Sequence, residues 1–273
     1  MKKALFVFAS VAVISACAAQ DGSKAPAVSE AVPPKASPLG SASYLGSTAL
    51  PESLELVPAP PAAGSAAEAR DEAGAANALT LRGSARWDIA KGDAELSPAA
   101  VASRFSCAAG VSIGKQETPA LYKVIATAEP DLGIATSDVK KHYMRPRPFM
   151  KNGQPTCTPD WEAVLRRDGS YPSGHSSIGY GVGLILAEII PDRAARLVSR
   201  GRAFGDSRRI CNVHWLSDIE EGRVVASATV MRLNADPAFA VDIAAARSEI
   251  ERLRASGAGI MPDCNSERTA LAL

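Results

Sequence analysis

Hydrophobic side chains follow their most regular pattern in the stretch that begins at Ser173. They recur at i, i+4, i+7, i+8 and i+11, at Ile178, Val182, Ile185, Leu186 and Ile189. This spacing follows the helical period and places the side chains on one face of an α-helix. Pro191 should end this helix and begin another, which we expect to run to about Phe204.

Start and stop signals mark further helices along the chain. Ser65 can cap a helix that Gly83 ends. Ser97-Pro98 and Thr118-Pro119 each place a proline at the first helical position after a capping residue. We expect further helices at 131–141, 160–167, 214–233 and 239–253, and extended chain at 51–61 and 145–149.

These patterns predict an all-α fold, in the form of a single multi-helix globular domain over residues 51–257. The sequence contains no strand pattern of useful length and no internal repeat. The longest apolar run within this domain, 182–190, includes Glu188 and is too short to span a membrane. We expect residues 258–273 to form a loose tail.

The first residues have the features of a targeting segment. Lys2 and Lys3 precede an apolar run over 4–16, and Ile14-Ser15-Ala16-Cys17 resembles the lipobox of bacterial lipoproteins. In that interpretation residues 1–17 hold the signal peptide, and Cys17 is lipidated and becomes the mature N-terminus. Ordinary cleavage after Ala18 is the alternative. The Ala/Pro/Ser-rich stretch 18–50 predicts a flexible linker, which favours the lipoprotein.

Composition narrows the classes of partner and of site. The chain has 273 residues and a net charge of +1, which argues against a nucleic-acid polymer as the main partner. Apart from Cys17, the cysteines are Cys107, Cys157, Cys211 and Cys264. In an oxidising compartment they could form two disulfides in any of three connectivities. The chain contains no CxxC motif and no Cys/His cluster with zinc spacing, so we expect no structural metal.

His214 and Asp218 form the first candidate for catalytic chemistry. If the chain after Asn212 is helical, the two side chains lie on one helix face at i and i+4. A carboxylate that accepts a proton from one ring nitrogen would leave the other nitrogen as a base or nucleophile. Taken alone, such a pair is more often a solvated surface pair.

Two other stretches could bind an anion. Residues 140–148 carry four Lys or Arg side chains, and Arg147 lies between two prolines that restrict its backbone. Pro172-Ser173-Gly174-His175 begins the long apolar helix, where unpaired backbone N–H groups form a ready site for an oxyanion. The simpler alternatives are a solvated basic face and a plain serine cap beside a surface histidine.

Together these stretches match the signature of the superfamily of type-2 phosphatidic acid phosphatases and vanadium haloperoxidases. The signature is Lys, six residues, Arg-Pro; then Pro-Ser-Gly-His; then Ser-Arg, five residues, His, three residues, Asp. Here it corresponds to Lys140, Arg147-Pro148, Pro172-Ser173-Gly174-His175, Ser207-Arg208, His214 and Asp218. Every defining position is present in order, so the resemblance is highly specific.

Other segments resemble the class A bacterial non-specific acid phosphatases, over roughly residues 53–255. These segments are Val57–Pro61, Arg86-Trp87, Arg104–Cys107, Tyr143–Arg145 and His214-Trp215. Pro146, Arg209 and Asn212 depart from the residues that are usual in this family, which leaves the substrate preference open. The resemblance implies that residues 51–257 are an acid phosphatase catalytic domain, with its active site at the ends of core helices.

The resemblance also implies a phosphate-binding set. Lys140, Arg147 and Arg208 would hold the non-bridging oxygens of a phosphoryl group. The Ser173 hydroxyl and the Gly174 N–H would assist them, because charge-assisted hydrogen bonds strengthen as charge develops in the transition state. Three fixed cations would perform the task that a divalent ion performs in other phosphatases, so we expect neither a metal nor another cofactor.

The catalytic roles would fall to His214, Asp218 and His175. His214 would attack phosphorus and form a phosphohistidine, while Asp218 holds its ring and stabilises the positive charge. His175 would protonate the leaving alkoxide and then activate water for the second step. His142, the remaining histidine, receives no role.

The expected function is hydrolysis of phosphate monoesters, with broad specificity and an acid pH optimum. A vanadium haloperoxidase, a lipid phosphate phosphatase and a non-catalytic envelope lipoprotein are the alternatives. We expect small phosphorylated substrates, membrane contact only through the lipid anchor, and a periplasmic location at the outer membrane. Class A relatives often form dimers, so a homodimer is a further expectation from the resemblance.

Overall fold

The computed structural model of the protein describes Met1, residues 42–257 and residues 263–271. The predicted signal peptide, Cys17 and most of the predicted linker lie outside the described residues. The described helices are α1 (Ser53–Leu56), α2 (Ala66–Leu79), α3 (Ala85–Gly92), α4 (Pro98–Ala109), α5 (Pro119–Ile134), α6 (Ser137–Tyr143), α7 (Pro148–Asn152), α8 (Glu162–Leu165), α9 (Gly174–Ile189), α10 (Ala194–Ile210), α11 (Leu216–Leu233), α12 (Pro237–Ser256) and α13 (Asn265–Leu271). Short 3₁₀ turns lie at Pro159–Trp161 and Pro191–Arg193.

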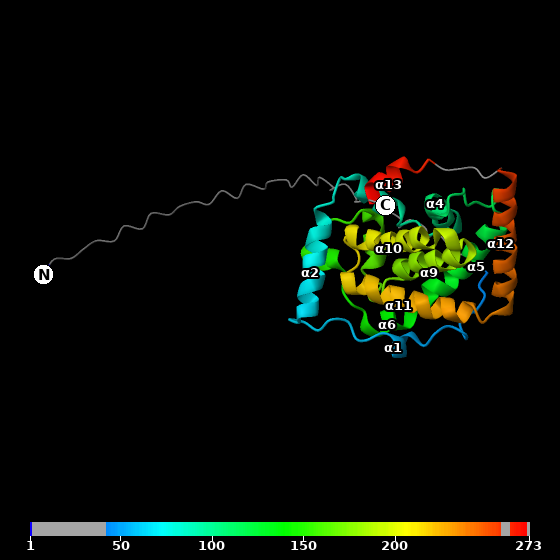
Figure 1. Ribbon diagram of the computed structural model, residues 1–273. Helices are drawn as coiled ribbons and strands as arrows, with labels where there is room; N and C mark the ends of the chain where they lie inside the picture. Colours follow the sequence, from blue (N-terminus) through cyan, green and yellow to red (C-terminus); the bar gives the residue numbers. More distant parts are fainter. Residues whose placement is uncertain (2–41, 258–262, 272–273) are drawn as a thin grey trace, which may run out of the picture. The chain divides into compact units, whose positions relative to one another are not determined.

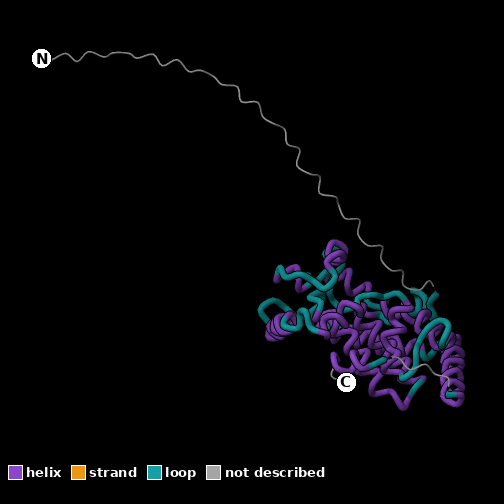
Figure 2. The backbone as a smooth tube through the Cα atoms, turned by 90° about the horizontal axis from the view of Figure 1, so that it is seen from above, coloured by secondary structure: helices purple, strands orange, loops and turns teal. Residues whose placement is uncertain are grey.

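Helix α9 is the central element, and α5, α10 and α11 pack around it (Figure 1). Its predicted apolar face is buried, with Val182, Ile185 and Leu186 each 0% exposed. Burying one such side chain contributes about 1.5–3 kcal/mol. Figure 2 shows the described chain as helices joined by loops, without a strand, so the predicted all-α class is confirmed.

Two glycines bring the ends of the core helices together. A Cβ atom on Gly205 of α10 would lie 2.6 Å from the Ser176 Oγ of α9. A Cβ atom on Gly222 of α11 would lie 2.6 Å from the carbonyl oxygen of Ser173, which caps α9. Any side chain at these positions would separate the helices. Helices α10 and α11 therefore both lie close against the first turns of α9.

The prediction of one helix at 131–141 is wrong, because α5 and α6 share this stretch. Helix α5 runs from Pro119 through Pro130 to Ile134, and the separate α6 begins at Ser137. A proline inside a helix removes a hydrogen bond and usually ends it. Here the helix continues because its residues on both sides of Pro130, such as Val124 and Leu132, are fully buried in the core.

Three other helix boundaries differ from the sequence pattern. Helix α10 continues past Phe204 to Ile210, and its last turns bury polar residues such as Ser207 and Arg208. Helix α11 begins at Leu216, so His214 lies before the helix and not inside it. Helix α3, for which the sequence predicted nothing, begins at Ala85 after the N-cap Ser84, whose hydroxyl accepts a hydrogen bond from the Trp87 N–H.

Both predicted terminal segments contain residues that contact the domain. Tyr44, assigned to the linker, packs edge-on against Phe239 at 5.2 Å, and its hydroxyl donates to Asp242 at 2.8 Å. In the predicted loose tail, α13 follows Cys264, which forms a disulfide with Cys107 of α4. The second disulfide joins Cys157 to Cys211, so the structure selects one of the three connectivities. These contacts join segments far apart in sequence, which no local pattern reveals.

The predicted extended segment at 51–61 lies on the domain and includes the single turn of α1. Val57 is buried, and the Tyr171 hydroxyl donates to the carbonyl oxygen of Pro58 at 2.7 Å. This segment therefore packs against the chain that leads into α9. Among the described residues, none of the helices combines the length and the apolar character that a membrane span requires.

Candidate active site

A cavity of about 310 Å³ opens where the ends of the core helices meet. It is lined by Leu96, Gly133, Ile134, Thr136, Ser137, Lys140, Arg147, Leu165, Asp168, Gly174, His175, Ile178, Arg208 and His214. Most of the predicted site residues are therefore in its wall, although they come from three distant parts of the chain. Ser173 and Asp218 do not line it and lie behind the wall, each 0% exposed.

The His214–Asp218 pair forms through a helix cap. Trp215 is the N-cap of α11, and its backbone N–H donates to Asp218 Oδ2 at 2.9 Å. The same oxygen lies 3.2 Å from His214 Nδ1. The predicted pairing is thus present. The sequence suggested that both side chains lie on one helix face, whereas His214 lies in a turn before the helix.

The other nitrogen of His214, Nε2, lies 3.0 Å from Nη1 of Arg147. A guanidinium can only donate, so we assign Nε2 as the acceptor and place the ring proton on Nδ1, facing Asp218. Burial and the charges of Arg147, Lys140 and Arg208 lower the pKa of His214 well below its usual value. The imidazole is therefore neutral at physiological pH, with its lone pair on the nitrogen opposite Asp218.

Arg147 is fully engaged by the protein itself. Its Nε donates to the Leu165 carbonyl at 3.0 Å, and Nη1 donates to the Val213 carbonyl at 3.0 Å. Its Nη2 donates to Asp168 Oδ2 at 2.8 Å. The same Asp168 oxygen lies 3.4 Å from Lys140 Nζ. Sequence reasoning missed Asp168, whose carboxylate accepts hydrogen bonds from two of the predicted phosphate-binding cations.

Arg208 is the cation with open donors. It is 3% exposed, and its Nε and Nη1 have no hydrogen-bond partner among the described residues. Burial and the charge of Arg147 lower its pKa to about 9, and burial lowers the pKa of Lys140 to about 8. Buried, unpaired guanidinium donors are costly unless a ligand satisfies them. Arg208 lines the cavity, and its buried guanidinium therefore suits an anion bound there.

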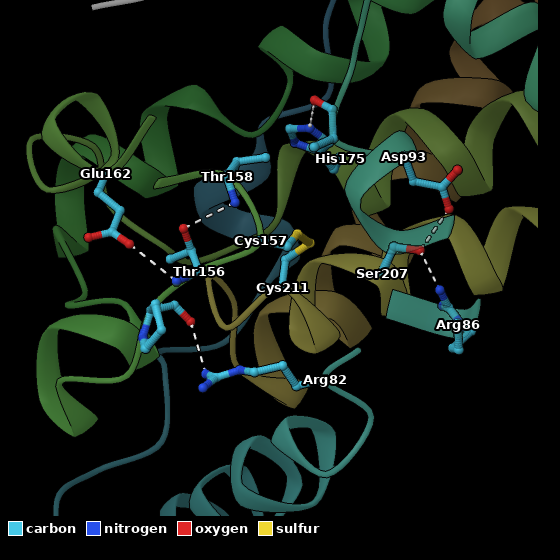
Figure 3. Close-up of a disulfide and its surroundings, with 12 residues drawn as sticks. Arg82, Arg86, Asp93, Thr156, Cys157, Thr158, Glu162, His175, Ser207 and Cys211 are labelled. Atoms are coloured by element: carbon cyan, nitrogen blue, oxygen red, sulfur yellow. Dashed lines mark hydrogen bonds between the residues drawn. A yellow bond between two sulfur atoms is a disulfide. The ribbon is translucent and has the colours of Figure 1, made fainter. Parts of the chain in front are cut away.

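His175 is oriented by the loop between α3 and α4. Its Nε2 lies 3.1 Å from the Ala94 carbonyl oxygen, which can only accept, so Nε2 carries a proton (Figure 3). Asp93, the residue before Ala94, is held by the Arg200 guanidinium at 2.6 Å and by the Ser207 hydroxyl at 2.7 Å. Burial and then the charge of Arg208 lower the pKa of His175 well below its usual value.

The start of α9 agrees in part with the predicted oxyanion site. Gly174, whose backbone N–H the sequence proposed as a phosphate donor, lines the cavity. Ser173 caps the helix, and its Oγ accepts a hydrogen bond from the Ser176 N–H at 3.2 Å. That bond uses a lone pair of the oxygen and not the hydroxyl proton. Within residues 42–257 and 263–271, no group of three or more His, Cys, Asp or Glu side chains could share a metal ion.

Arg145 is a further residue to which the sequence assigned no role. Its Nη1 donates to Asp218 Oδ1 at 2.7 Å, and its Nη2 donates to Asp71 Oδ2 at 2.8 Å. It therefore contacts the carboxylate that orients His214. No local signal separates Arg145 from the other cations of its stretch, because its partners come from α2 and α11.

Comparison with known proteins agrees with this geometry. Residues 123–237 match the PAP2 superfamily. The chain is 41% identical over 207 residues to an acid phosphatase of Zymomonas mobilis, covering 74% of this chain and 76% of the relative. It is 37% identical over 212 residues to a non-specific acid phosphatase of Providencia stuartii, covering 77% of this chain and 86% of the relative. A non-specific acid phosphatase of Salmonella typhimurium is 38% identical over 195 residues, covering 71% of this chain and 78% of the relative. With the signature residues gathered at one cavity, these similarities show that the chain belongs to the bacterial non-specific acid phosphatases of the PAP2 superfamily.

Proposed function

We propose that the protein hydrolyses phosphate monoesters through a phosphohistidine at His214. The observation that carries the proposal is the buried guanidinium of Arg208, with unpaired Nε and Nη1, in the wall of the same cavity as His214 and His175. A phosphoryl group bound there would satisfy Arg208 and meet both imidazoles. Phosphoryl transfer depends mainly on positioning and charge stabilisation, which this cavity supplies.

In the first step Arg147 Nη1 transfers its hydrogen bond from His214 Nε2 to a phosphoryl oxygen. The freed Nε2 lone pair attacks phosphorus, and the bond to the ester oxygen breaks. Protonated His175 gives its proton to the leaving alkoxide. In the second step His175 takes a proton from water, and the hydroxide attacks phosphorus. The P–N bond then breaks and releases inorganic phosphate. Asp218 accepts a hydrogen bond from the Nδ1–H of His214 throughout and stabilises the cationic phosphoimidazole.

An acid optimum follows from the role of His175. Because burial lowers the pKa of His175, its acid form is present only below that lowered value, and kcat/KM should fall as the pH rises through it. A bound phosphate dianion beside His175 raises its pKa in the complex, so kcat should persist to higher pH than kcat/KM. Profiles of both parameters with para-nitrophenyl phosphate check this. A kcat/KM that still rises above neutral pH would contradict it.

The nucleophile is tested by trapping the intermediate. Acid-labile, base-stable label from a ³²P-monoester should appear on the wild type and be absent from His214→Ala, which should not turn over. His142→Ala is the matched control, because His142 is exposed and outside the cavity. Normal turnover by His214→Ala would contradict the proposal.

Vanadate should inhibit and EDTA should not, whereas bromide oxidation after vanadate loading would indicate a haloperoxidase.

We also propose that the chain is exported and tethered by a lipid on Cys17. The basic start, the apolar run and the lipobox-like residues support this, and two disulfides fit an oxidising compartment. Cys17→Ser should move phosphatase activity from the membrane fraction to the soluble periplasmic fraction. Activity of the wild type in the soluble fraction would support cleavage after Ala18.

The mass of the purified protein in solution tests the expected homodimer.

A further inference from the structure

Asp71 is a buried carboxylate of α2 that no part of the signature includes. It is 1% exposed. Its Oδ1 accepts from the Ser217 N–H at 2.8 Å, and its Oδ2 accepts from the Ser217 hydroxyl at 2.6 Å. Oδ2 also accepts from Arg145 Nη2 at 2.8 Å. The carboxylate therefore joins α2 both to the first turn of α11 and to Arg145.

Arg145 continues this connection to the nucleophile. Its Nη1 donates to Asp218 Oδ1 at 2.7 Å, and the opposite carboxylate oxygen, Oδ2, faces His214 Nδ1 at 3.2 Å. Arg145 also lies over the Trp215 ring, with its Cζ 5.4 Å from the ring centroid. The result is a row of alternating charges, Asp71–Arg145–Asp218, that ends at His214. All three charged side chains are at most 11% exposed, so solvent screens the row only weakly.

The position of Asp71 has a consequence for the charge at the nucleophile. With Asp71 present, the Arg145 guanidinium is shared between two carboxylates. Without it, the whole charge of Arg145 acts on Asp218, which becomes a weaker acceptor for the Nδ1 proton of His214. His214 gains a positive charge when its Nε2 is phosphorylated, so uncompensated Arg145 should oppose that step in particular.

We propose that Asp71 is a positioning residue of the phosphatase site, which acts through Arg145 to keep Asp218 an effective partner of His214. The proposal rests on the proposed function. Asp71 precedes residues 123–237, the part that matches the superfamily. Helix α2 thus adds a buried counter-charge to the catalytic motif from outside the matched segment.

The test is single-turnover release of para-nitrophenol with enzyme in excess, since its rate constant reports phosphoryl transfer to His214. Asp71→Asn should lower this rate constant, measured at saturating enzyme, by about 10- to 100-fold, with little change in KM or in the folded fraction read from near-ultraviolet circular dichroism. A purely structural role would lower the folded fraction and leave the rate constant at saturating enzyme unchanged. Glu72→Gln, an exposed neighbour on α2, is the matched control and should behave as the wild type.

A double-mutant cycle keeps the test decisive if Asp71→Asn folds poorly. Because Asp71 is proposed to act through Arg145, adding Asp71→Asn to Arg145→Gln should lower the rate constant no further. Additive losses, or a wild-type rate constant for Asp71→Asn, would overturn the inference while the wild type remains an active phosphatase. If the wild-type protein did not hydrolyse the substrate, the proposed function itself would be wrong.

Discussion

At the scale of single residues, the structure changes what the predicted phosphate cations do before substrate arrives. The sequence singled out Arg147 and Lys140, and both line the cavity. Asp168 holds Arg147 at 2.8 Å and Lys140 at 3.4 Å, so its carboxylate lies on the donors that phosphate oxygens would use. Asp168 is 49% exposed and can move away when a ligand enters.

We therefore expect Asp168→Asn to bind inorganic phosphate more tightly. A partly exposed ion pair contributes about 1 kcal/mol or less, which corresponds to a fall of about fivefold in the phosphate inhibition constant. Competitive inhibition of para-nitrophenyl phosphate hydrolysis measures it. Asp160→Asn, which removes an exposed charge outside the cavity wall, is the control. An unchanged or higher inhibition constant for Asp168→Asn would show that Asp168 supports the site and does not compete for it.

At the scale of helices, hydrophobic periodicity located most core elements, and it failed where polar residues are buried. Helix α10 ends in Ser207, Arg208, Arg209 and Ile210, and the sequence pattern stopped at Phe204 because such residues are usually exposed. The structure buries Arg208 at the cavity and Ser207 against Asp93. In helix α5 the sequence pattern predicted a break that the structure does not have, because core packing keeps the helix continuous across Pro130.

Helix α5 also contains a buried acid that should make stability depend on pH. Glu129 is 0% exposed, and neither carboxyl oxygen has a hydrogen-bond partner among the described residues. Burial and the charge of Glu95 raise its pKa from 4.5 to about 8. The folded chain thus keeps a proton that the unfolded chain releases, so this group costs stability as the pH rises from about 4.5 to about 8.

Glu129→Gln should remove that dependence. Its melting temperature relative to the wild type should increase with pH across this range and level off above about pH 8. Thermal unfolding at a series of pH values measures the difference. Glu117→Gln, at an exposed position, is the control and should show no such trend. A difference in melting temperature that does not vary with pH would contradict a buried, titrating Glu129.

At the scale of the whole molecule, contacts between distant segments hold the site together. The Cys157–Cys211 disulfide (Figure 3) attaches the loop before α8 to the end of α10. In the sequence, Cys211 lies between Arg208 and His214. The Cys107–Cys264 disulfide instead attaches the chain before α13 to α4, away from the cavity lining. The two bonds should therefore serve different purposes.

Paired serine substitutions separate these purposes. Each pair should lower the free energy of unfolding by about 2–5 kcal/mol, measured by urea denaturation. Cys157→Ser/Cys211→Ser should also lower kcat by about tenfold or more, because the chain that carries Arg208 and His214 loses its tether. Cys107→Ser/Cys264→Ser should retain kcat in the fraction that remains folded. Equal losses of kcat in the two variants would refute the distinction.

Local patterns in the chain are enough to predict the helical class, the central helix and the signature residues, most of which line the cavity. Helical periodicity, capping residues and motif spacing are properties of short segments, so they can be read without coordinates. The partner of each buried polar side chain is set by the folded chain: Asp168 for Arg147, Asp71 for Arg145, and the Ala94 carbonyl for His175. The folded chain also sets the disulfide pairing. The physical reason is that each of these contacts joins segments far apart in sequence, and packing of the helices around α9 brings them within reach.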